Sequence, residues 1–82
     1  MVEQIMEPVD VIASFSGGQI RPRAFLWRKR KYMVSSVNLA YFGKDGKDPI
    51  YFFSVSDGAN AYKLSFRPSK MIWNLMELYA EG

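Results

Sequence analysis

The 82-residue sequence contains no cysteine, no histidine and no threonine. Without cysteine and histidine, the usual zinc sites, cysteine nucleophiles, Ser-His-Asp triads and histidine general bases are excluded. Small secreted domains are often cross-linked by disulfides, so the absence of cysteine favours a reducing compartment, and we expect a cytoplasmic protein. The spacing of the remaining acidic, lysine and tyrosine residues suggests no catalytic pair. We therefore expect a protein that is not an enzyme and has no metal site and no cofactor.

Long apolar runs are absent too. No run approaches the ~18 residues that a membrane-spanning helix requires, and residues 1–7 include acidic residues but no basic segment of the kind that begins a signal peptide. We therefore expect no membrane association. What the chain does have is apolar material for one core, because 49% of its residues are hydrophobic and 16% are aromatic. At this length we expect a single small β domain over residues 1–82.

The basic residues are concentrated in one part of the chain. The net charge is +3, yet residues 1–16 carry −3, residues 17–32 carry +6, and residues 33–82 are balanced. A cluster of this kind is typical of surfaces that attract anionic partners such as nucleic acids. Its members are Arg21, Arg23, Arg28, Lys29, Arg30 and Lys31.

Alternation of apolar and polar residues predicts β-strands along most of the chain. Residues 9–16 have the pattern of a half-buried strand that ends at Gly17-Gly18, where glycine permits a turn. Pro22 restricts the backbone beside it and is expected to delay the next strand. A later strand is predicted from residue 32 to residue 42, with a bend near its start.

A hairpin is predicted around Asp57-Gly58, a dipeptide that favours two-residue hairpin loops. Its strands are residues 50–56 and 62–66, and both are rich in aromatic and branched side chains. The expected cross-strand partners are Phe53 with Tyr62 and Tyr51 with Leu64. The preceding loop, 43–49, is interpreted as a turn, because its two aspartates are too few to hold a calcium ion.

A second hairpin is predicted with the basic residues at its tip. Its strands are residues 24–27 and 32–34, joined by Lys29-Arg30 as a two-residue loop or by a four-residue loop that gives the same facing. Either loop pairs Trp27 with Tyr32 and Phe25 with Val34. All four side chains then lie on one side of the sheet, as aromatic and branched partners prefer.

The last apolar segment, 69–79, fits two structures. Its apolar stripe and the capping residue Ser69 after Pro68 favour a helix by local propensity. We predict an all-β fold, a small curled antiparallel sheet or barrel of five to six strands. The alternative is that residues 69–79 are helical, which would make the fold α+β.

A series of short motifs has the order of a known family. The motifs are Pro22-Arg23-Ala24-Phe25-Leu26-Trp27-Arg28, Tyr32-Met33-Val34, Phe53-Ser54-Val55-Ser56-Asp57, Tyr62-Lys63-Leu64 and Trp73-Asn74-Leu75. Over residues 7–79 the chain resembles the small C-terminal β domain of ImuB-type proteins, which are Y-family-polymerase-like bacterial damage-tolerance factors. It also resembles related short stand-alone bacterial proteins of unknown function. The chain lacks the late histidine and the acidic, arginine-rich lead of the polymerase-linked version. The resemblance implies a bacterial protein linked to DNA repair, a closing strand around Trp73 and no catalytic residues.

The function expected from these observations is that of a non-catalytic, nucleic-acid-associated accessory module for DNA repair or damage tolerance. Its six clustered basic residues would contact DNA or RNA phosphates, and Trp27 or Tyr32 would offer a face for base stacking. The competing interpretation is a solvated hairpin tip with both aromatics in the core. The alternative function is a protein–protein interaction adaptor with no nucleic-acid contact, docking through residues 71–79 unless they close the core. The sequence leaves the partner and the oligomeric state open.

Overall fold

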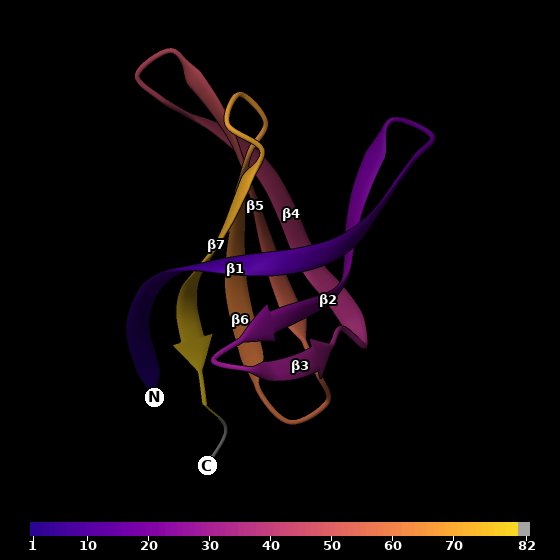
Figure 1. The fold of residues 1–82 in the computed structure, drawn as a ribbon, viewed down its shortest axis with the longest axis vertical. Helices are drawn as coiled ribbons and strands as arrows, with labels where there is room; N and C mark the ends of the chain where they lie inside the picture. Colours follow the sequence, from indigo (N-terminus) through magenta and orange to yellow (C-terminus); the bar gives the residue numbers. More distant parts are fainter. Residues whose placement is uncertain (81–82) are drawn as a thin grey trace.

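The structure, a computed structural model, describes residues 1–80 as one antiparallel sheet of seven strands (Figure 1). The strands are β1 (Val2–Ser16), β2 (Gln19–Trp27), β3 (Arg30–Met33), β4 (Ser36–Asp45), β5 (Asp48–Ser56), β6 (Ala61–Arg67) and β7 (Ile72–Tyr79). Their order across the sheet is β3-β2-β1-β7-β6-β5-β4. The all-β prediction is confirmed, with one or two strands more than expected. The helical alternative for residues 69–79 is wrong, because β7 is paired with β1 on one side and β6 on the other.

The long strand β1 joins two parts of the sheet, one made of β2 and β3 and the other of β4 to β7. Its first half pairs with β7 and its second half pairs with β2, so it crosses the molecule in Figure 1. The register shifts between Gln4 and Glu7, where Met6 has a φ of 56°, and again between Ile12 and Ala13. Such bulges bend a strand and increase its twist. The bends therefore let one strand serve both parts of the sheet.

The core lies on the concave side of the curled sheet. Aromatic side chains from β2 and β3 reach across it to β6, although β3 lies four strands from β6 in the sheet order. The ring of Tyr62 lies 5.1 Å from that of Phe25 and 5.7 Å from that of Tyr32, centroid to centroid. Leu64 and Leu75 are completely buried beside this cluster. The curl is thus what brings the two ends of the sheet over a common core.

Both predicted hairpins have the expected facing but a register displaced by two residues. Phe53 pairs with Leu64, not with Tyr62, because the loop is four residues long, from Asp57 to Asn60. The carboxylate of Asp57 accepts hydrogen bonds from the amides of Ala59 (2.9 Å) and Asn60 (2.7 Å), which organises the longer loop. A displacement of two residues preserves the side of the sheet on which each residue lies.

Pro22 lies inside β2 and does not delay it, contrary to the prediction. β3 pairs only with residues Ala24–Trp27 of β2, so the first part of β2 is bonded to β1 alone. Proline is tolerated in edge strands and beside bulges, and Pro22 is next to the register shift of the β1–β2 pair. The predicted strand from residue 32 to 42 is likewise interrupted, at Val34-Ser35.

The sheet does not close into a barrel, and its edge strands are β3 and β4. They are joined by Val34 and Ser35, whose amides donate to the carbonyls of Arg23 (2.9 Å) and Ser56 (2.8 Å). These bonds hold the two parts of the sheet together at this end. The first part of β2 and the whole of β4 have one strand neighbour each, so both present unpaired backbone groups on the other edge.

The buried position of Leu64 predicts a large loss of stability on truncation. We expect Leu64→Ala to lower the free energy of unfolding by about 2–5 kcal/mol, because it opens a cavity in a packed core. Urea denaturation measures the change. The control is Leu39→Ala, on a leucine that is 56% exposed, and it should change stability by about 0.5 kcal/mol or less. Equal losses in the two variants would contradict this placement of the core.

The buried phenol of Tyr62 predicts a loss of stability at alkaline pH. Burial and the hydrogen bond that its hydroxyl donates to Asp57 (2.7 Å) raise the pKa of Tyr62 from 10.0 to about 12. The folded protein therefore holds this proton more tightly than the unfolded chain, and the associated stability falls as pH rises from 10 through 12. Denaturation at a series of alkaline pH values should show a steeper decline for the wild type than for Tyr62→Phe. Parallel declines would show that Tyr62 does not cause the effect.

Candidate nucleic-acid interface

The basic hairpin forms, with a turn one position earlier than predicted. Trp27 pairs with Arg30 and Phe25 pairs with Tyr32, so the two loop residues are Arg28 and Lys29. Both have positive φ, 52° and 67°, which non-glycine residues adopt at a cost. The prediction of Lys29-Arg30 as the loop is therefore wrong in register, although the facing of Phe25, Trp27 and Tyr32 toward the core is confirmed.

The conformation of Arg28 is held by contacts that the sequence did not reveal. The Arg28 guanidinium donates to a carboxylate oxygen of Glu7 at 2.7 Å, and it lies over the Trp27 ring at 4.6 Å from the centroid. The other oxygen of Glu7 accepts the indole N–H of Trp27 at 3.0 Å. Arg28, and then Trp27, lower the pKa of Glu7 through these bonds, so the carboxylate stays ionised at neutral pH. Arg28 is thus an anchor of the turn and is already paired with an anion.

The two aromatic residues proposed as stacking faces belong to the core. Trp27 is only 9% exposed, and its ring lies 5.8 Å from that of Tyr32. Tyr32 is half-buried and stacks on Phe25 with centroids 5.1 Å apart. In this arrangement neither ring presents a free face of the kind on which a nucleotide base stacks.

The remaining basic residues of the cluster are exposed, and none forms an ion pair within residues 1–80. They are Arg21, Arg23, Lys29, Arg30 and Lys31. Arg21 donates to the side chain of Gln19 and Arg23 to Ser14, and both acceptors are neutral. The guanidinium of Arg30 lies over the ring of Tyr32 at 5.7 Å. The β2–β3 region therefore presents five positive charges that no acidic side chain of the described chain neutralises.

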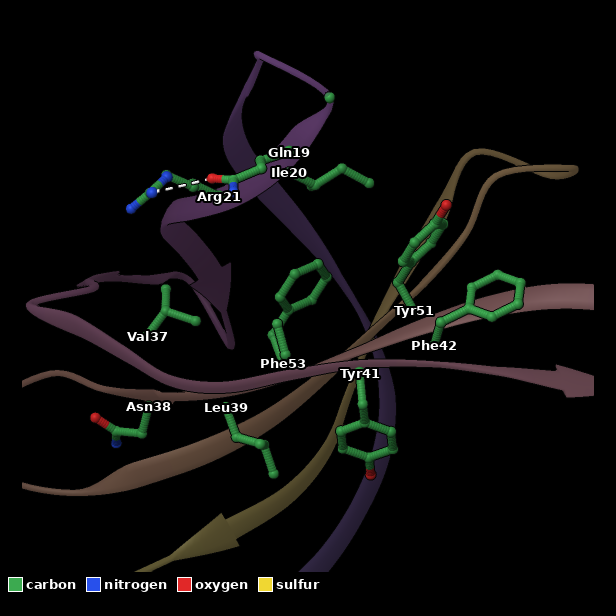
Figure 2. Close-up of a pocket in the computed structure, with 12 residues that line it drawn as sticks. Gln19, Ile20, Arg21, Val37, Asn38, Leu39, Tyr41, Phe42, Tyr51 and Phe53 are labelled. Atoms are coloured by element: carbon green, nitrogen blue, oxygen red, sulfur yellow. Dashed lines mark hydrogen bonds between the residues drawn. The ribbon is translucent and has the colours of Figure 1, made fainter.

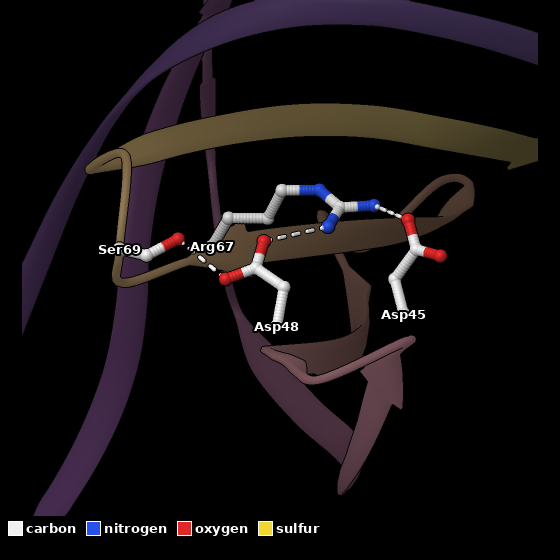
Figure 3. A network of polar contacts seen from close by, with 4 residues as sticks. All are labelled: Asp45, Asp48, Arg67 and Ser69. Atoms are coloured by element: carbon white, nitrogen blue, oxygen red, sulfur yellow. Dashed lines mark hydrogen bonds and ion pairs between the residues drawn. The ribbon is translucent and has the colours of Figure 1, made fainter.

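Arg67 differs from these five cations because it is paired with acidic side chains. Its guanidinium donates to Asp48 at 3.0 Å and to Asp45 at 2.9 Å, and Ser69 donates to the other oxygen of Asp48 (Figure 3). The network ties the end of β6 to the β4–β5 turn. The two aspartates thus serve a structural role, in agreement with the interpretation of their loop as a turn. No group of three or more potential metal-ligating residues occurs among the residues described.

The site that sequence reasoning missed is a groove of about 500 Å³ between β2 and β4. Figure 2 shows Ile20 and Arg21 on one wall, Val37 and Phe42 on the other, and Tyr51 and Phe53 at its base. The strand β4 is exposed along most of its length and carries apolar residues on both faces. The sequence of residues 36–42 shows this two-sided apolar pattern, but it does not reveal that the strand lies at an edge.

A second groove, of about 470 Å³, lies where β1 separates from β7. Phe15, Phe66 and Met71 are among the residues that line it. Within the C-terminal segment, Trp73 and Leu75 are buried in the core and Leu78 packs against it. Met71 and Ile72 remain 73% and 41% exposed, so only part of the apolar strip over residues 71–79 closes the core.

Comparisons of this chain with protein-family models, with curated proteins and with solved structures found no match. Within residues 1–80, no helix has the length and apolar character needed to cross a membrane.

The Glu7 contacts predict an acid-dependent contribution to stability. Because the pKa of Glu7 in the folded protein lies below its ordinary value of 4.5, its contribution is present above that pH and is lost as pH falls below it. Glu7→Gln should therefore be less stable than the wild type at neutral pH. Urea denaturation across this range should show the two proteins converging as the solution becomes acidic. A difference that stays constant with pH would contradict the ion pair with Arg28.

Proposed function

We propose that this protein is a non-catalytic module that binds DNA or RNA through phosphate contacts made by the β2–β3 region. The observation that carries the proposal is the gathering of five exposed cations without ion pairs on two adjacent strands and their turn. Unpaired cations of this kind can displace the counterions condensed on a nucleic acid. They contact its phosphates without first breaking ion pairs within the protein. The strands hold them on a rigid, aromatic-packed support.

The burial of Trp27 and Tyr32 refines the expected mode of binding. With Trp27 buried and Tyr32 half-buried and stacked on Phe25, affinity comes from phosphate contacts and not from base stacking. Such contacts carry little sequence information. We therefore expect binding that is weakly selective for sequence and strongly dependent on salt.

The role in DNA repair or damage tolerance is part of this proposal and rests on the resemblance to the ImuB-type β domain. Most of the apolar positions that carry the resemblance are core positions, including Phe25, Phe53, Tyr62, Leu64 and Leu75. Residues selected for packing support a common fold more directly than a common partner. The resemblance thus contributes the biological context, and the exposed cations contribute the binding chemistry.

The test is the salt dependence of binding after two turn and strand cations are removed. We expect Lys29→Ala with Lys31→Ala to reduce the slope of log affinity against log salt by about 1.4 for single strands or 1.8 for duplex DNA. Fluorescence anisotropy of labelled DNA and RNA, single- and double-stranded, measures the slope. Arg28 is left unchanged because it is bonded to Glu7.

The matched control is Lys44→Ala with Lys47→Ala, which removes the same charge from the end of β4 and the β4–β5 turn. Both lysines are exposed or half-exposed and form no ion pair in the described chain. This variant should retain the wild-type slope. Equal effects of the two double variants would show that net charge alone matters, and absence of binding at low salt would overturn the proposal.

A further inference from the structure

The groove between β2 and β4 has an unusual combination of walls. On one side, residues Gln19–Pro22 are bonded only to β1, and on the other side β4 is bonded only to β5. Both walls are therefore strand edges with unpaired backbone donors and acceptors, and they face a common space of about 500 Å³. An extended segment placed between them would find hydrogen-bonding partners on each of its own edges.

The side chains of the groove define what such a segment would carry. Ile20, Val37, Phe42 and Tyr51 make the lining apolar, and Phe42 is 53% exposed with no partner strand over it. None of the described residues that line the groove is acidic. Arg21 supplies one positive charge. Its guanidinium donates a hydrogen bond to the neutral side chain of Gln19 at 3.0 Å. The complementary segment is apolar at alternate positions and bears a carboxylate opposite Arg21.

A second copy of the chain could form fewer backbone hydrogen bonds with these two strand edges than a free peptide could. The β4 strand of a second copy is bonded to its own β5 along one edge, which leaves a single edge for pairing. The groove instead requires an occupant with two free edges. In the second groove the β1 wall beyond Val9 is bonded only to β2, but on the β7 wall only Ile72 lacks a β1 partner, and one residue is too short an edge to pair with an added strand.

We propose that this groove binds an extended, acidic and apolar peptide segment of a partner protein as an added strand between β2 and β4. Main-chain hydrogen bonds to both walls provide affinity, and the apolar pockets and Arg21 provide selectivity. The groove shares Arg21 with the proposed nucleic-acid surface, whereas the other four cations of that surface, Arg23, Lys29, Arg30 and Lys31, do not line the groove.

The first experiment selects ligands for the full-length protein from a displayed library of random peptides about eight residues long, a typical strand length. We expect the enriched peptides to share alternating apolar residues and an acidic residue. Arg21→Glu should shift the enrichment to basic peptides, because it reverses the only charge in the groove. Arg23→Glu is the matched control, since Arg23 lies on the same strand but does not line the groove. Enrichment that is unchanged by Arg21→Glu, or absent, would overturn the proposal.

The second experiment locates an enriched acidic peptide by amide hydrogen exchange. Slower exchange is expected in both Gln19–Arg21 and Val37–Phe42 when the peptide is bound. Protection of β4 alone would show pairing with a single edge, and protection that increases with protein concentration without peptide would show self-association. Either result would overturn insertion between the strands.

The affinity of the same peptide tests the apolar part of the site. Phe42→Ala should weaken binding by about tenfold or more. Phe15→Ala truncates a comparably exposed phenylalanine outside this groove (60% against 53%) and should leave the affinity within about twofold. Neither variant should alter the salt slope for nucleic acid. Peptide and nucleic-acid binding can thus fail separately, and equal losses in the two phenylalanine variants would contradict the proposal.

Discussion

The contact of Tyr62 with Phe25 and Tyr32 is the interaction on which the rest of the structure depends. It joins β6 to β2 and β3, which are far apart in the order of the sheet, and so it makes one curled sheet enclose its own core. Buried aromatic rings contribute large apolar areas and favour the offset and edge-to-face geometries seen here. The hydroxyl of Tyr62 is satisfied by Asp57, which organises the loop of the same hairpin immediately before β6.

The same curl accounts for the positions of the two surfaces that we propose as binding sites. Because β2 and β3 fold over the core, their outward side chains and their turn gather the basic residues on the surface. Because the sheet stops short of closure, β2 and β4 face each other across a groove and not through hydrogen bonds. An edge of this kind favours uncontrolled strand pairing in many proteins. In the proposed mode of binding, the confinement of this edge between two walls limits access to a single extended segment.

Much of the fold could be predicted because the side-chain period of a strand is two residues. The alternation placed Phe25, Trp27, Tyr32, Phe53 and Tyr62 on one face. Four of them are buried core residues, and the half-buried Tyr32 packs against that core. The facing of the side chains does not fix the register, because a displacement of two residues leaves every side chain on the same face. At Arg28 and Lys29, contacts with Glu7 and Trp27 accompany backbone angles that these residues rarely adopt in isolation. At Asp57, hydrogen bonds from later amides favour a longer loop.

Some features of the fold and of the candidate sites follow from the sequence alone, and others depend on the tertiary structure. The sequence by itself determined the all-β character, the inward face of the strands in the two predicted hairpins, the absence of cysteine and histidine chemistry and the concentration of positive charge, because these follow from composition and local period. Only the tertiary structure decided that Arg28 is neutralised by Glu7, that Trp27 is enclosed and that β2 and β4 leave a groove between them. These features depend on which strands become neighbours, and that choice is made by long-range packing around Tyr62 that no local pattern encodes.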